Sequence, residues 1–224
     1  MKNLVYFLCF FCLICNAKTI TVGKTHTVKT IKQGLALAND GDTVLVTPGI
    51  YKEGNILINK KIIFLGINFP TLDGQNKFEV VSVAADNVVV KGFKIINSGY
   101  AALDDPCGIK VYDRSFVRIE NNILDNNFFG IYLQNSKNSL VKNNFIKAYG
   151  KQEQLIGNGI HCWKSENLQI IGNKISGHRD GIYFEFVTNS VIWRNISNHN
   201  IRYGLHFMFS NDDSYITNVF KNNG

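Results

Sequence analysis

Four side chains with metal-binding or acid–base groups lie in short, similar segments of the C-terminal half. His206 and Met208 lie in GLHFMF, His161 lies in GIHCWK and Glu185 lies in GIYFEF. Met208 is the only methionine besides Met1. An imidazole and a thioether together suit copper, above all Cu(I), for which methionine sulfur is a soft ligand. The pair therefore indicates either a copper site or, because aromatic side chains surround it, a protein contact surface.

The segments that carry these residues belong to an internal repeat. Each begins with a glycine, and an asparagine follows 14 residues later: Gly108, Gly130, Gly159, Gly181 and Gly204, then Asn122, Asn144, Asn173, Asn195 and Asn218. The glycines are 22, 29, 22 and 23 residues apart, and the extra length is an insertion at 147–158. A leucine ladder with helical segments, as leucine-rich repeats require, is not visible. We predict an all-β fold, a right-handed parallel β-helix of about 22-residue coils with stacked, hydrogen-bonded asparagines.

Alternation along each strand predicts which side chains face outward. The residue after each glycine is aliphatic and is expected to point inward, so the second and fourth residues point outward. Two outward columns follow, Lys110, Tyr132, His161, Tyr183 and His206, and Tyr112, Gln134, Trp163, Glu185 and Met208. Because coils stack about 4.8 Å apart, these columns form one patch. In it Tyr132, Trp163 and Tyr183 are expected to contact a partner or ligand beside His206 and Met208.

The chain divides into three predicted segments. Residues 1–17 are typical of a secretory signal peptide, with Lys2, an apolar run and a cleavage site after Ala17. Residues 18–59 are expected to hold an amphipathic helix, with apolar residues at 28, 31, 35 and 38, that caps the first coil. Residues 60–224 are expected to be the repeats, with TLDGQN at 71–76 as a turn. Because the sequence stops at KNNG, one turn into a further coil, the C-terminal coils are expected to be missing.

Charge and cysteine usage restrict the possible partners. The chain has 24 basic and 17 acidic residues, and removal of Lys2 leaves 23 against 17, spread without a basic block. This mild balance of +6 does not favour nucleic acid. Of the two cysteines after the leader, Cys162 is expected in the core and Cys107 in a turn, so no disulfide is expected. His178 and His199 are expected to be solvated turn residues.

An alternative function is carbohydrate binding or action on a uronate polymer, because an aromatic, basic face suits sugars. Hydrolysis needs two carboxylates that flank the bond, and calcium-assisted lyase chemistry needs clustered carboxylates. No pair is predicted among the candidates, which are Asp104, Asp105, Asp180, Glu185, Asp212 and Asp213. On the residues alone, an enzyme stays open as an alternative.

Two segments closely resemble the motif region of the NosD family, the periplasmic β-helix proteins of nitrous oxide reductase maturation. They are HRDGIYFEFVTNS at 178–190 and NIRYGLHFMFSND at 200–212. The resemblance extends upstream through FFGIYLQNS and NGIHCWKSENLQIIGNKISG to GDTVLVTPGIY. The capping helix, the TLDG turn and the Gly/Asn coils are shared by many pectin-lyase-like β-helices, which include the CASH proteins.

The resemblance implies an exported, periplasmic and non-enzymatic accessory protein that helps to deliver copper to nitrous oxide reductase. It implies as partners the membrane subunit and ATPase of an ABC transporter, a copper chaperone lipoprotein and nitrous oxide reductase itself. Copper would bind transiently to His206 and Met208, with His161 and Glu185 beside them. A scaffold that docks a membrane partner through the aromatic patch fits the sequence equally well.

Overall fold

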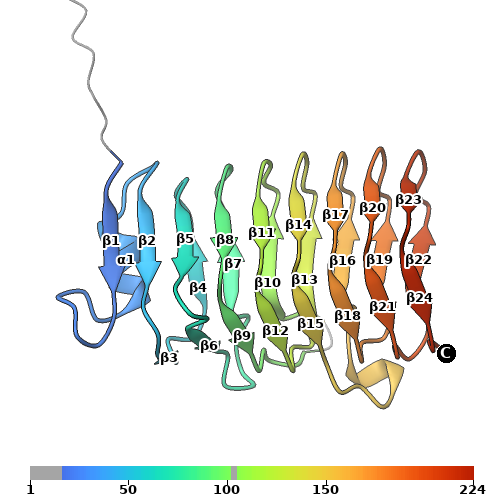
Figure 1. The fold of residues 1–224 in the computed structure, drawn as a ribbon, viewed down its shortest axis with the longest axis horizontal. Helices are drawn as coiled ribbons and strands as arrows, with labels where there is room; N and C mark the ends of the chain where they lie inside the picture. The colour runs from blue at the N-terminus through green and yellow to red at the C-terminus, as the bar shows by residue number, and fades with distance from the viewer. Residues whose placement is uncertain (1–16, 102–104) are drawn as a thin grey trace, which may run out of the picture.

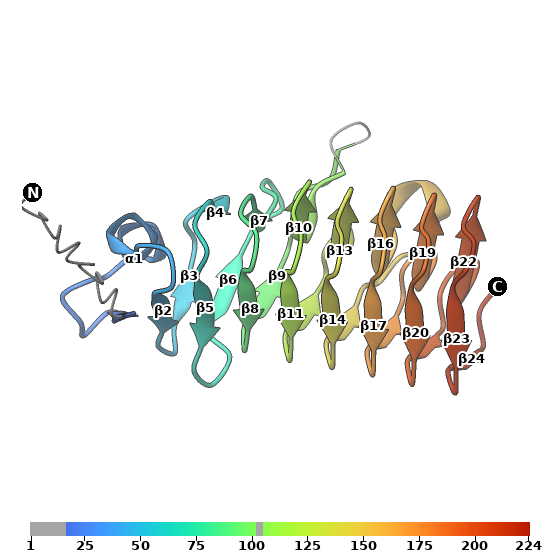
Figure 2. The same ribbon diagram turned by 90° about the horizontal axis from the view of Figure 1, so that it is seen from above.

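The chain winds around three parallel β-sheets that run the length of the molecule (Figures 1 and 2). The computed structural model describes residues 17–101 and 105–224, so the expected signal peptide lies outside the described residues apart from Ala17. Every strand pair is parallel. Each full coil passes through the three sheets in turn, as β10, β11 and β12 do before β13 begins the next coil.

In the described part of the chain, the sheets contain seven, nine and eight strands. The seven-stranded sheet consists of β4 (Ile56–Ile58), β7 (Val81–Val83), β10 (Cys107–Tyr112), β13 (Phe129–Gln134), β16 (Ile160–Trp163), β19 (Ile182–Glu185) and β22 (Leu205–Met208). The nine-stranded sheet consists of β1 (Thr19–Val22), β2 (Thr43–Val46), β5 (Ile63–Gly66), β8 (Val89–Lys91), β11 (Arg118–Glu120), β14 (Leu140–Lys142), β17 (Gln169–Ile171), β20 (Val191–Trp193) and β23 (Ser214–Ile216). The eight-stranded sheet consists of β3 (Ile50–Tyr51), β6 (Thr71–Asp73), β9 (Lys94–Ile96), β12 (Ile123–Asp125), β15 (Phe145–Lys147), β18 (Lys174–Ser176), β21 (Ile196–Asn198) and β24 (Val219–Lys221).

The repeat glycines lie where neighbouring coils approach most closely. A Cβ added to Gly159 would lie 2.6 Å from the carbonyl oxygen of Gly181, and one added to Gly181 would lie 2.8 Å from that of Gly204. A side chain at these positions would force adjacent coils apart. The residue after each glycine points inward as predicted, and Ile160 and Ile182 are fully buried. The glycines therefore fix the register in which the outward residues stand beside one another.

Asparagines form a ladder at the turn between the nine-stranded and eight-stranded sheets. From Asn144 onward, the Oδ1 of each accepts hydrogen bonds of 2.8–3.1 Å from the backbone N–H and the Nδ2 of the asparagine one coil earlier. The Oδ1 of Asn122, the first of the ladder, accepts from the backbone N–H of Phe93 at 3.0 Å. The preceding residue has a left-handed φ between 49° and 66° in every coil of the ladder. The ladder contains the predicted residues Asn122, Asn144, Asn173, Asn195 and Asn218. It satisfies backbone groups that would otherwise be buried without partners.

The one α-helix among the described residues, α1 (Ile31–Leu37), covers the first coil as predicted (Figure 2). Thr30 caps its N-terminus by accepting a hydrogen bond from the backbone of Gln33 at 3.2 Å. Ile31 is fully buried, and Gly34 lies against Val22 of β1. Within residues 17–101 and 105–224, no helix has the length and apolar character needed to cross a membrane.

Two features of the connections matter for the site. The predicted insertion at 147–158 lies between β15 and β16 and contains a short 3-10 helix, η1 (Glu153–Leu155). The prediction of a turn over TLDGQN is wrong for its first half, because Thr71–Asp73 pairs with β3 and β9 as strand β6. Only the part after Asp73 turns, with left-handed φ values at Gln75 and Asn76.

Candidate functional site

The two predicted outward columns stand side by side on the outer face of the seven-stranded sheet. The register pairs Tyr132 with His161, His161 with Tyr183, and Tyr183 with His206. The second column is paired in the same way, from Gln134 through Trp163 and Glu185 to Met208. All the residues predicted to form the patch are therefore neighbours, on strands β10, β13, β16, β19 and β22.

The first column is much less exposed than the sequence predicts. Tyr132, His161 and Tyr183 each retain only 7% of their accessible surface. Their rings cover one another, with centroids 4.4 Å apart for Tyr132 and His161 and 4.8 Å apart for His161 and Tyr183. The ring of His206 continues the row, 4.8 Å from Tyr183. The surface of the patch is formed mainly by the second column, where Trp163 and Glu185 are half-buried and Met208 is 39% exposed.

Asp180, one residue before Gly181, is fully buried beside this row of rings. Its carboxylate accepts hydrogen bonds from three residues. Arg202 donates from Nη2 to Oδ2 at 2.5 Å and from Nε to Oδ1 at 3.1 Å. The backbone N–H of Tyr203 lies 3.2 Å from Oδ1, and Nδ1 of His206 lies 3.2 Å from Oδ2. The hydrogen bond to Asp180 raises the pKa of the Arg202 guanidinium above its ordinary value. The carboxylate of Asp180 is therefore hydrogen-bonded on both oxygens within the protein.

This arrangement fixes the orientation and the tautomer of His206. Both oxygens of Asp180 accept hydrogen bonds, so Nδ1 of His206 carries the proton that is donated to Oδ2. The lone pair then lies on Nε2, as in histidines that act as general bases or metal ligands. A carboxylate behind the ring also stabilises the imidazolium that forms when Nε2 accepts a proton.

His161 has the opposite tautomer. Oδ1 of Asn158 accepts from the backbone of Asp180 and from Nε of Arg179, both at 3.3 Å, so its amide group faces Nδ1 of His161 and donates to it at 3.2 Å. Burial, followed by the charges of Arg179 and Lys110, lowers the pKa of His161 to about 3. The ring is therefore neutral at pH 7. Its buried Nε2–H has no hydrogen-bond partner among the described residues, with Oε2 of Glu185 4.0 Å away.

The predicted copper ligands do not converge on one point. The hydroxyl of Tyr183 donates to the sulfur of Met208 at 2.9 Å, and Nδ1 of His206 is engaged by Asp180. In the described part of the chain, no three His, Cys, Asp or Glu side chains are placed to hold a metal ion. His206 and Met208 remain neighbours on β22, two residues apart on the same face.

Two predictions about residues near the site are wrong. Cys107 is the first residue of β10 and not part of a turn, because the strand extends one residue before its glycine; the side chain is buried against Phe129 and Tyr132. His178 is not solvated but 1% exposed, because the insertion passes over it and the carbonyl of Gly157 lies 3.3 Å from Nδ1. Burial lowers the pKa of His178 to about 4.

The two cysteines and His199 have no group that is free for this chemistry or placed in it. Cys162 is fully buried in the core, as predicted, and both it and Cys107 are free thiols. Burial raises the pKa of both thiols well above the ordinary value, so neither is a ready nucleophile. His199 is exposed in a turn, as predicted.

Sequence reasoning considered Asp180 but did not pair it, and it missed Arg202 and Asn158. It followed only the residues after each glycine. Asn158 and Asp180 come one residue before Gly159 and Gly181, and Arg202 comes two before Gly204. If the repeats are aligned from two residues before each glycine, these polar residues fall in adjacent coils. The sequence therefore contained the information that could have found them.

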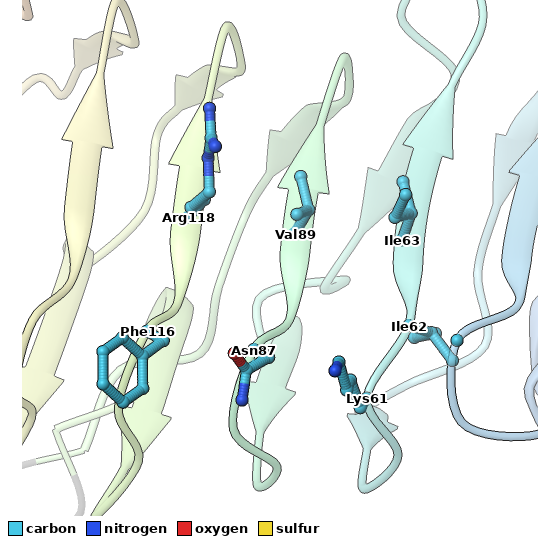
Figure 3. Close-up of a pocket in the computed structure, with 8 residues that line it drawn as sticks. Lys61, Ile62, Ile63, Asn87, Val89, Phe116 and Arg118 are labelled. Carbon is cyan, nitrogen blue, oxygen red and sulfur yellow. The ribbon is translucent and has the colours of Figure 1, made fainter.

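An apolar groove of about 320 Å³ lies on another face, over strands β5, β8 and β11 of the nine-stranded sheet (Figure 3). Ile63, Val89 and Phe116 line it, and Arg118 at its edge pairs with Glu120 at 2.6 Å. Lys61 and Arg118 are its only charged lining groups among the described residues. It has no acid–base pair, so the face with His206 is the better candidate site.

Comparison with known proteins identifies the fold. A family model described as "Right handed beta helix region" matches residues 78–224. No curated protein sequence matches the chain. The crystal structure of pectate lyase Pel9A superposes with a TM-score of 0.65 at 15% identity, over 90% of this chain and 68% of that one. A lacto-N-biosidase of class GH136 from Eubacterium ramulus gives a TM-score of 0.63 at 11% identity, over 88% of this chain and 56% of that one.

These findings confirm a right-handed parallel β-helix and correct one expectation. They do not single out the NosD family. The prediction that the protein is not an enzyme is wrong, because the similar structures are those of a pectate lyase and a lacto-N-biosidase. The fold is one on which enzymes are built, and the resemblance from which the prediction was drawn is not borne out by these comparisons.

Proposed function

Since the chain belongs to the right-handed β-helix family, we propose that it binds a saccharide and acts on it with His206 as a general base. The binding surface is the outer face of the seven-stranded sheet, over β13, β16, β19 and β22. The observation that carries the proposal is the pairing of Asp180 with His206 at the end of a continuous row of aromatic rings.

The face has the groups that sugars require. Aromatic rings pack against the apolar faces of sugar rings, and a few charged side chains hydrogen-bond to their hydroxyls. Trp163 is half-buried on this face, with the ammonium group of Lys164 4.4 Å from its ring centroid. Glu185 is half-buried on the neighbouring strand. These residues come from strands and from the turn next to them, so their positions are fixed before a ligand binds.

The geometry favours proton abstraction over hydrolysis by two carboxylates. Asp180 is fully buried and bonded to Arg202, Tyr203 and His206, so it cannot reach a glycosidic bond. His206 is half-buried, and its Nε2 is the nitrogen that can accept a proton from a bound substrate. Asp180 then balances the charge of the imidazolium. A general base of this kind contributes about 10²- to 10⁴-fold in rate.

The structures of similar fold support the class of ligand. One is named a pectate lyase and the other a lacto-N-biosidase, and both names refer to carbohydrate substrates. At 15% and 11% identity they share only the fold with this chain. The class of ligand is therefore argued from the aromatic and charged side chains of the face, and the similar structures are consistent with it.

The test combines binding with turnover. The chain is run in native gels that contain single polysaccharides, neutral or acidic, and the polymers that retard it are assayed for new reducing ends and for unsaturated products. His206→Gln should reduce turnover at least 100-fold and leave retardation unchanged. His199→Gln, at an exposed turn, is the matched control and should change neither. Turnover by His206→Gln at the wild-type rate, or retardation by no polymer, would refute the proposal.

Copper delivery is a second candidate, favoured by the position of Met208. Its sulfur is at the surface, beside an imidazole whose Nε2 lone pair faces away from Asp180. A two-ligand, accessible site suits transient Cu(I) binding. In this hypothesis His206 and Met208 are the copper ligands, and His161 and Glu185 are further ligands beside them. A periplasmic location, an ABC transporter, a copper chaperone lipoprotein and nitrous oxide reductase as partners all belong to it.

An anaerobic Cu(I) titration against a competing chelator tests this candidate separately. Met208→Leu keeps the volume of the side chain but removes the sulfur, and should weaken Cu(I) binding at least 10-fold. Equal Cu(I) affinity of the variant and the natural chain would count against a copper role for this strand.

A further inference from the structure

We propose a second binding site on the same face, in which Lys110 binds a carboxylate group of the ligand. It lies at the other end of the row of rings, where β7 and β10 adjoin a groove beside Glu79. The proposal rests on the proposed function only in taking an acidic saccharide as the carrier of the carboxylate. The site itself is argued from the surroundings of Lys110.

Lys110 is a largely buried lysine whose ammonium group contacts two aromatic rings. Only 7% of the residue is exposed, although it points to the outer side of the sheet. Its Nζ lies 4.9 Å from the ring centroid of Tyr112 and 4.8 Å from that of Tyr132. Among the described residues it makes no hydrogen bond and no salt bridge. Contacts with two aromatic faces offset only part of the cost of desolvating an ammonium group.

A groove that is lined by Tyr112, the residue whose ring Lys110 contacts, supplies the other contacts that a sugar acid needs. It has a volume of about 430 Å³ and is lined by Asn55, Lys77, Phe78, Glu79, Ser82, Tyr100, Ala101, Pro106 and Tyr112. Glu79 accepts hydrogen bonds from Ser82 and from the hydroxyl of Tyr112, which lies 3.0 Å from Oε2. Burial raises the pKa of Glu79 above its ordinary value. Convergent polar groups in a groove with an altered titration mark a binding site.

The charges of this cluster select a carboxylate as the group that Lys110 binds. An ammonium group has three donors, and a carboxylate accepts them in short, charge-assisted hydrogen bonds. The carboxyl of Glu79 lies close enough to Lys110 for the ammonium to lower its pKa, yet forms no salt bridge with it. Glu79 can accept from a sugar hydroxyl, and the rings of Phe78 and Tyr100, 40% and 55% exposed, can contact an apolar ring face.

The position of Lys110 defines the length of the ligand. It occupies the same column as His206, and β13, β16 and β19 lie between their strands. At about 4.8 Å per strand, the two sites are roughly 19 Å apart along the face. Only an extended chain of several sugars reaches both. A monosaccharide acid should therefore occupy the Lys110 site alone.

The test uses galacturonate and galactose, which differ by the carboxylate. Both are titrated into the ¹⁵N-labelled chain, and the amide signals of Tyr112 and Tyr132 report this site, while those of Tyr203 and His206 report the other. Galacturonate should shift Tyr112 and Tyr132 with an affinity at least 10-fold higher than that of galactose. Lys110→Met keeps the apolar stem and should abolish this preference. Lys147→Met is the control, because Lys147 also lies over a tyrosine ring, 4.9 Å from Tyr149, but on β15.

Each outcome decides the proposal. Equal shifts with galactose and galacturonate, or full galacturonate binding by Lys110→Met, would refute a carboxylate site. If Lys110→Met does not fold, the comparison of the two sugars on the natural chain still decides. One outcome is that galacturonate shifts the amide signals of Tyr112 and Tyr132 while an oligosaccharide leaves that of His206 unchanged. This result would support the Lys110 site and contradict the proposed function. Oligosaccharide effects confined to Tyr203 and His206 would do the reverse.

Discussion

Three histidines of one small region do not all carry the proton on the same ring nitrogen. A neighbouring hydrogen-bonding group sets the tautomer of each. Asp180 takes the Nδ1–H of His206, the amide of Asn158 faces Nδ1 of His161, and the carbonyl of Gly157 takes the Nδ1–H of His178. His206 and His178 therefore keep lone pairs on Nε2, and His161 keeps a proton there. Only in His206 is the lone pair backed by a carboxylate, which is why the proposed base is this residue.

Long-range ¹H–¹⁵N spectra of the imidazoles test this assignment at pH 7. We predict Nδ1–H for His206 and His178 and Nε2–H for His161. Asp180→Asn should remove the strong preference of His206 for one tautomer, because a neutral amide no longer requires a donor. An Nε2–H tautomer of His206 in the natural chain would contradict its role as a general base.

The two buried histidines make the fold sensitive to acid. The folded pKa values of about 3 for His161 and about 4 for His178 lie below the ordinary value of 6.5. The unfolded chain therefore binds more protons than the folded chain below pH 6.5, so their contribution to stability is complete above pH 6.5 and is lost as the pH falls toward 3–4. For His178 alone the loss is about 3 kcal/mol.

Urea unfolding at pH 7 and at pH 4 measures this effect. His178→Asn should make the free energy of unfolding less dependent on pH by about 3 kcal/mol, whatever its effect at pH 7. His199→Gln, at the exposed turn position, should leave the dependence as it is. An unchanged dependence in His178→Asn would show that the side chain is solvated, as the sequence alone predicted.

At the level of the elements, the asparagine ladder holds the coils in register. Asn173 is fully buried, accepts from Asn144, and donates to the carbonyl of Val141 and to Asn195. Asn173→Ala leaves several buried polar groups without partners, at a cost of about 1–3 kcal/mol each. We predict a loss of about 3–5 kcal/mol in the free energy of unfolding, measured by urea denaturation.

Asn218 provides the comparison within the same ladder. It is only half-buried and has no further asparagine to bond to among the described residues. Asn218→Ala should therefore cost about half as much as Asn173→Ala or less. Equal losses would mean that the ladder is not what stabilises the interior coils.

Elements that repeat could be predicted, and the contacts that depend on a single loop could not. The 14-residue spacing from glycine to asparagine predicted the ladder, and alternation after the glycine predicted that Tyr183 and His206 are neighbours. The burial of His178 depends on the insertion at 147–158, whose path no repeat defines. The pairing of Asp180 with Arg202 joins different offsets of adjacent coils, 22 residues apart in sequence, so an analysis of one strand at a time misses it.

At the level of the whole molecule, the β-helix provides a long, rigid face with two different ends. The Lys110 end presents a largely buried lysine and a groove lined by Tyr112, and the His206 end presents the carboxylate-backed base. A continuous row of rings connects them. Such a face is suited to one extended ligand that contacts several coils at once, and less to a compact ligand held in a closed cavity.

Tryptophan fluorescence tests the central claim, saccharide binding on this face, most directly. The chain has two tryptophans: Trp163 lies on the proposed face, and Trp193 lies on β20 of the nine-stranded sheet. In a Trp193→Phe variant, the emission of Trp163 should change saturably as an acidic oligosaccharide is added. In a Trp163→Phe variant, the emission of Trp193 should stay constant. No change in the first variant, or a saturable change only in the second, would contradict the account.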